Sequence, residues 1–150
     1  MCGGSRRVMY MRAAPSDTRP DRISSYIAQL AQRLDAHVRD VAESLGITAG
    51  QTIALRELSE PLTLSELATR MACERPNATY VADRMEKQNL IERRAHPHDR
   101  RSKVVVLTPA GQRCRLNVLR ALAENSPIDT MTPSDQAELA DVLSRVVKGL

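Results

Sequence analysis

Three cations lie close together in one charged stretch of the chain. Residues 96–103 read HPHDRRSK, so that Arg100, Arg101 and Lys103 all follow Asp99 within four positions. Guanidinium and ammonium groups at this density suit phosphates, and arginine also suits the narrow minor groove of A·T-rich DNA. The segments 91–95 and 103–107 predict two strands that would place these cations at the tip of a hairpin. The spacing therefore indicates contact with a nucleic acid.

Another set of polar side chains recurs on the segment 76–87 and at Arg75 just before it. The spacing of Ala78, Val81, Ala82 and Met85 predicts a helix with one buried face, and Pro76 suits its first position. Its exposed side would carry groups that bond base edges or phosphates. These candidate DNA-binding residues are Arg75, Pro76, Asn77, Thr79, Tyr80 and Arg84, joined by Arg100, Arg101 and Lys103 of the hairpin.

A helix over 64–71 and a tight turn over 72–75 would precede this helix. Two short helices joined in this way form a helix-turn-helix, whose second helix fits the major groove of DNA. The charged hairpin that follows would then be a wing. The order of these parts predicts a winged helix-turn-helix.

Capping residues predict where the helices begin and end. The sequences TAGQ at 48–51 and TLSE at 63–66 have the spacing of a capping box. Thr-Pro pairs at 108–109 and 132–133 predict an N-cap followed by a proline in the first turn. Asn89 suits the left-handed residue that ends a helix.

The helices at the two ends of the chain carry narrow apolar stripes. In the first helix, which Gly46 would close, apolar residues are spaced alternately by four and three, as in a helix that packs against a partner. The last helix has a similar stripe. The stripe residues are Ile23, Ile27, Leu30, Leu34, Val38, Val41 and Leu45 in the first helix, and Leu139, Val142, Leu143, Val146 and Leu150 in the last.

The predicted fold is mainly α with a small antiparallel β-hairpin wing: a winged helix-turn-helix with N- and C-terminal dimerisation helices. Residues 1–20 are expected to be a mobile tail, and residues 21–45 the N-terminal dimerisation helix. Residues 46–108 would form the DNA-binding head, and residues 109–150 the C-terminal helices of the dimerisation region. The 150 residues suit one domain, whose core must be aliphatic because the chain has no Phe or Trp.

Charge and composition exclude several classes of protein. The net charge of +4 is concentrated in residues 1–20 and 61–103, each with three more basic than acidic residues, as suits a polyanionic partner. No apolar run is long enough for a membrane span, and the first residues lack the apolar region of a secretory signal, so we expect a cytoplasmic protein. No catalytic arrangement stands out, and the chain is not expected to be an enzyme or to need a cofactor.

The cysteines and histidines leave one alternative function open. Cys2, Cys73 and Cys114 are too scattered for a disulfide framework. Cys73 in the predicted turn or Cys114 in the fifth helix could serve thiol-based redox sensing, although Cys114 as a packed small apolar side chain and Cys73 as an incidental thiol are favoured. His96 and His98 are too few to hold a metal, so no metal site is predicted. A winged protein-interaction module that does not read DNA is a further alternative.

Three segments give the chain a resemblance to the MarR (multiple antibiotic resistance regulator) family. They are LSELATRM at 64–71, DRMEKQNLIERR at 83–94 and HPHDRRSKVVVLTPAG at 96–111. The resemblance implies that Arg101 enters the minor groove and that Asp99 orients it. Asn89 replaces a more usual glycine, and Pro76 stands where a serine is often found, which changes an anchoring contact.

The resemblance also implies how the protein would work. Family members are homodimers whose first and last helices interlock and which bind double-stranded DNA. This chain would bind a pseudo-palindromic operator, repress by occupying a promoter, and be released by a small-molecule effector. No membrane partner is expected.

Overall fold

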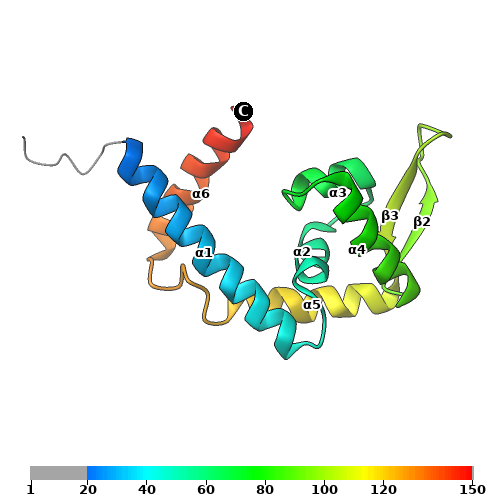
Figure 1. Cartoon of the computed structure of the whole chain (residues 1–150), viewed down its shortest axis with the longest axis horizontal. Coiled ribbons are helices and arrows are strands. Elements are labelled where there is room, and N and C mark those ends of the chain that lie inside the picture. The colour runs from blue at the N-terminus through cyan, green and yellow to red at the C-terminus, as the bar shows by residue number, and fades with distance from the viewer. Residues whose placement is uncertain (1–19, 150) are drawn as a thin grey trace, which may run out of the picture.

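The computed structural model describes residues 20–149. The elements in chain order are α1 (Pro20–Ser44), α2 (Ala49–Glu57), β1 (Leu62–Thr63), α3 (Leu64–Arg70), α4 (Arg75–Lys87), β2 (Ile91–Ala95), β3 (Lys103–Leu107), α5 (Pro109–Ala123) and α6 (Pro133–Lys148). The elements from α2 to β3 form one unit, called the head (Figure 1). Helix α5 leads from the head to α1 and α6, called the arm. The predicted tail, apart from Pro20, lies outside the described residues.

The hydrophobic core lies in the head and is aliphatic. Its largest fully buried apolar side chains are Leu55, Leu67, Met85, Ile91, Val105 and Val118, which come from α2, α3, α4, β2, β3 and α5. The predicted buried face of α4 is confirmed, since Ala78, Val81, Ala82 and Met85 are all buried. One core therefore joins α4, the wing strands and α5.

The helix starts follow the predicted caps. In both capping boxes the threonine hydroxyl accepts a bond from the backbone of the third residue, whose side chain accepts one from the threonine N–H. The Thr63 backbone N–H, and then its hydroxyl, hold the pKa of the Glu66 carboxyl below its ordinary value. Thr108 and Thr132 cap α5 and α6, each followed by a proline. Helix α4 begins at Arg75, one residue before the predicted start, because Glu74 takes the N-cap position.

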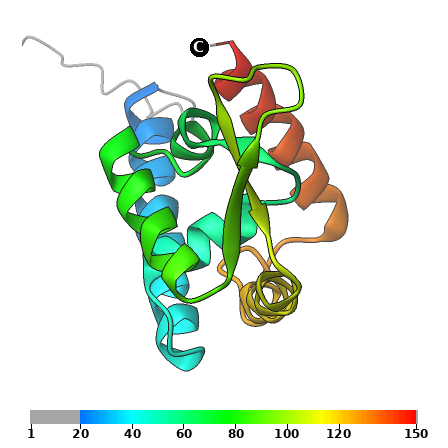
Figure 2. The same ribbon diagram turned by 90° about the vertical axis from the view of Figure 1, so that its right-hand side faces the viewer.

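The wing strands have the predicted bounds, and the sheet contains a third strand. Strands β2 and β3 pair antiparallel from Ile91 opposite Leu107 to Ala95 opposite Lys103. Strand β1 pairs with the other edge of β3, giving the order β1-β3-β2. The expectation of a two-stranded hairpin was incomplete, because β1 has two residues and shows no periodicity. Figure 2 shows the hairpin crossing the front of the head beside α4.

The end of α4, the start of β2 and the start of α5 meet at one junction. Asn89 has a positive φ of 56°, as predicted, and ends α4. Its carbonyl accepts a bond of 2.7 Å from the Thr108 hydroxyl, and the Leu90 carbonyl accepts one of 3.0 Å from the Thr108 N–H. The same Leu90 carbonyl faces Gly111, where a Cβ would lie 1.9 Å from the oxygen. The first turn of α5 therefore approaches Leu90, the residue before β2, closely enough to require glycine.

Replacing Gly111 by alanine should destabilise the head, because the added methyl group would overlap a hydrogen-bonded carbonyl. We expect a loss of about 3 kcal/mol or more in the free energy of unfolding, measured by urea denaturation. Gly46→Ala is the matched control. Gly46 has a φ of 68° but nothing within 4 Å of an added Cβ, so its loss should be about 1 kcal/mol. Equal losses for the two variants would contradict the close approach.

Candidate nucleic-acid interface

The outward face of α4 presents polar side chains to solvent. Arg75, Asn77 and Arg84 are exposed, as is Pro76, and the Tyr80 side chain is 64% exposed. Thr79 is half-buried, and its hydroxyl donates a 2.9 Å bond to the Arg75 carbonyl. This bond leaves the Thr79 hydroxyl oxygen as an acceptor and its methyl group as an apolar contact.

The wing and the helix pair form a groove that brings together cations far apart in the sequence. This wing groove encloses about 360 Å³ and is lined by Thr63, Leu64, Ser65, Arg75, Arg101, Ser102 and Lys103. Three predicted residues, Arg75, Arg101 and Lys103, therefore line one concave surface. Thr63, Ser65 and Ser102 add hydroxyl groups that the sequence did not single out, because their proximity comes from the fold. Arg100 is exposed in the wing loop but does not line the groove.

Hydrogen bonds hold the wing loop in shape. The Asp99 carboxylate accepts a 2.9 Å bond from the Arg101 N–H, and the Asp99 carbonyl accepts a 3.1 Å bond from the Ser102 N–H. The His96 ring accepts a 3.1 Å bond from the His98 N–H. Asp99 thus fixes the backbone at Arg101 and leaves both arginine side chains exposed.

The surface formed by the outward face of α4 and the wing carries more positive than negative charge. Within residues 20–149, no ion pair neutralises the five predicted cations, which are Arg75, Arg84, Arg100, Arg101 and Lys103. By contrast, Arg93 of β2 pairs with Asp83 and Glu86 of α4, a contact that the sequence does not predict. The surface therefore presents free positive charge to a polyanion.

The two described cysteines are free and partly buried against the core. Burial raises the pKa of the Cys114 thiol, so that less thiolate is present at neutral pH. Since thiolate is the reactive form, Cys114 is poorly suited to redox sensing. Cys2 lies outside the described residues.

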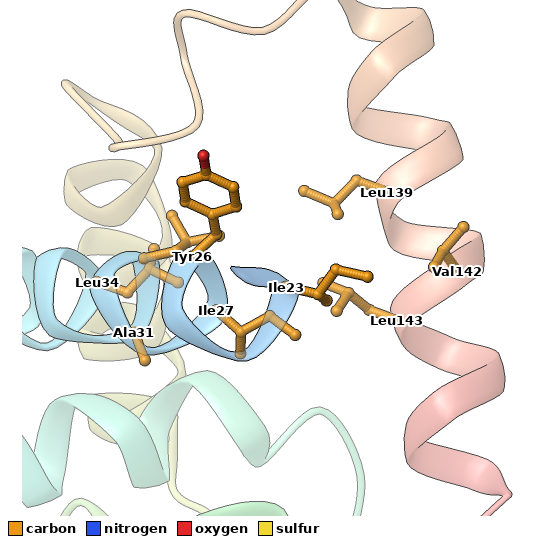
Figure 3. A pocket seen from close by; sticks show the side chains of 9 residues that line it. Ile23, Tyr26, Ile27, Ala31, Leu34, Leu139, Val142 and Leu143 are labelled. Atoms are coloured by element: carbon orange, nitrogen blue, oxygen red, sulfur yellow. The ribbon is translucent and has the colours of Figure 1, made fainter. Parts of the chain in front are cut away.

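The arm leaves apolar side chains uncovered. Helix α6 has no buried residue among those described, and Ile23, Ile27, Val142 and Val146 are between 41% and 58% exposed. Figure 3 shows the apolar side chains of α1 and α6 that line a cleft of about 390 Å³.

In α1, Val38, Val41 and Ala42 are buried. Nearby, the His37 Nε2–H donates a 3.0 Å bond to the Leu122 carbonyl of α5, so His37 lies at the edge of the core. Across residues 20–149, no helix is both long and apolar enough to cross a bilayer.

Comparison with known proteins identifies the head. Residues 47–103 match the model of the MarR family. The HTH-type transcriptional repressor MdtR of Bacillus subtilis is 34% identical over 84 residues, which cover 55% of this chain and 54% of MdtR. The uncharacterized HTH-type transcriptional regulator YsmB of the same organism is 31% identical over 93 residues, covering 61% and 64%. The match thus spans less than two thirds of either relative.

Solved structures resemble the whole described fold. A probable transcriptional regulator from Pseudomonas aeruginosa is 30% identical, with a TM-score of 0.63, over 84% of this chain and 97% of its own. Apo wild-type MarR from E. coli gives a TM-score of 0.68 at 22% identity, over 83% and 96%. A MarR-family regulator from Silicibacter pomeroyi gives 0.75 at 19%, over 92% and 97%. The predicted fold class is confirmed, and these relatives regulate transcription rather than catalyse reactions. Residues 47–103 therefore carry the MarR-family domain, and the described residues share the winged helix fold of MarR-family regulators.

Proposed function

We propose that the protein binds a pseudo-palindromic operator in double-stranded DNA as a homodimer and represses transcription by occupying a promoter. The wing groove carries this proposal, because it joins Arg75 at the start of α4 to Arg101 and Lys103 of the wing. This surface would hold DNA with α4 in the major groove and the wing in the adjacent minor groove. The name of the relative MdtR, a transcriptional repressor, supports repression.

Each part of the surface has a distinct role in this proposal. Asn77, Tyr80 and Arg84 reach base edges in the major groove, where their amide, hydroxyl and guanidinium groups read donor and acceptor patterns. Thr79 and Pro76 add contacts at the start and edge of the helix. The remaining cations, Arg75, Arg100 and Lys103, bind phosphates, and Arg101 enters the minor groove from the loop that Asp99 shapes.

A second copy of the chain would cover the arm. The uncovered side chains of α1 and α6 are apolar and line one cleft, as expected of helices that pack against a partner. A two-fold dimer would place two recognition helices about 34 Å apart, one turn of DNA. A small-molecule effector that favoured a different arm geometry would change this spacing and release the DNA.

Arg101→Ala should weaken binding to any duplex, because Arg101 would contact groove and backbone electrostatically. We expect the slope of log K against log salt to fall by about 1, with unfolding free energy changed by less than about 0.5 kcal/mol. Fluorescence anisotropy with a random-sequence duplex at low and moderate salt measures the slope. Arg56→Ala, which removes an exposed cation already paired with Glu57 on α2, is the control.

Two results would count against the DNA-binding proposal. If Arg101→Ala bound duplex with wild-type affinity, the wing would not be part of the DNA interface. Failure of the wild-type protein to bind duplex at either salt would favour the alternative of a protein-interaction module.

Ile27→Glu should dissociate the dimer, because a carboxylate would be buried in an apolar interface. The side chain is 50% exposed in the single chain, so the head should stay folded. Sedimentation analysis should show a mass near twice 16.6 kDa for wild type and near 16.6 kDa for the variant. Gln29→Glu, on the other face of α1, should remain dimeric. A dimeric Ile27→Glu protein would show that this stripe is not the interface.

A further inference from the structure

Arg93 connects the wing to the recognition helix through two ion pairs. Its Nη2 lies 2.5 Å from Asp83 Oδ1, and its Nη1 lies 2.5 Å from Glu86 Oε2. The two acids are three residues apart, so both lie on the side of α4 that faces β2. The Arg93 side chain is 21% exposed, whereas Asp83 and Glu86 are 50% and 40% exposed. The guanidinium is therefore enclosed between two carboxylates, which themselves remain open to solvent.

Those carboxylates lie on the helix that would read DNA. Asp83 is adjacent to Arg84 and lies one turn from Tyr80, two exposed residues of the α4 face. Charges interact over about 10 Å at 0.1 M salt, so two uncompensated acids here would repel nearby phosphates. Arg93 neutralises much of that charge from within the protein.

The neighbouring Arg94 provides an internal comparison. Successive strand residues point to opposite faces, so Arg94 lies behind the sheet, where it pairs with Glu92 of its own strand. It lines a separate concavity with Glu60 and Gln112, away from the wing groove. Arg93 and Arg94 therefore carry the same charge on one strand but act on different surfaces.

We propose that Arg93 is a positioning residue for DNA binding, which acts through Asp83 and Glu86. It holds the two carboxylates against the wing and cancels their repulsion of the phosphate backbone. This inference rests on the proposed DNA-binding function. In this proposal, Arg93 affects the affinity of the protein for DNA without touching the DNA.

The experiment measures affinity for a random-sequence duplex across a salt series, using the full chain. Arg93→Gln should bind at least about threefold more weakly at low salt, with the difference shrinking as salt rises. The triple variant Arg93→Gln/Asp83→Asn/Glu86→Gln should recover wild-type affinity, because the repulsive charges are gone. A scaffold role alone would leave the triple variant as weak as the single one.

Two further variants complete the test. Arg94→Gln, which also removes a cation and leaves one acid unpaired, should bind within about twofold of wild type, since it lies behind the sheet. Asp83→Asn/Glu86→Gln with Arg93 retained should bind more tightly than wild type, and this result does not depend on whether Arg93→Gln folds. Wild-type affinity of Arg93→Gln, an unrescued triple variant, or no gain in the double variant would overturn the inference. A wild-type protein that binds no duplex would instead refute the DNA-binding function on which it rests.

Discussion

The arrangement of the head depends on the junction at which α4 ends and α5 begins. Two adjacent carbonyls at the end of α4, those of Asn89 and Leu90, accept both hydrogen bonds that Thr108 offers. The Thr108 hydroxyl also accepts a bond from the Gly111 N–H, so one side chain caps α5 and ties it to the end of α4. Because Gly111 has no Cβ, the helix can approach the Leu90 carbonyl directly. This one junction therefore sets the orientation of α4, the start of the wing and the direction of α5.

Helix α5, which starts at this junction, leads from a closed head to an open arm. The head has a continuous buried core, whereas the arm presents apolar side chains that its own chain does not cover. Helix α5 crosses from one to the other, and His37 of α1 holds its far end through the Leu122 carbonyl. Helix α5 therefore connects the arm to the head that carries α4. In the proposed function, this connection turns dimer geometry into the spacing of two DNA-binding heads.

Local signals made most of the fold predictable from the sequence. Capping threonines, apolar spacing and β-branched runs act within a few residues, and they located the helices and both wing strands. Strand β1 was not predicted, because its two residues form a strand only by pairing with Val104 and Val105, far along the chain. The candidate site was predictable as a set of cations, since their types and density are local. The wing groove and the Arg93 ion pairs were not, because tertiary packing brings their members together.

In the proposed function, two copies of this head read DNA at a spacing fixed by the arm. The decisive experiment is selection of bound duplexes from a random pool, using the full chain. We expect enrichment of a pseudo-palindrome whose half-sites lie about 10 base pairs apart, centre to centre, with A·T-rich flanks where the wings enter the minor groove. Enrichment of a single unrepeated site, or no enrichment over the starting pool, would contradict it.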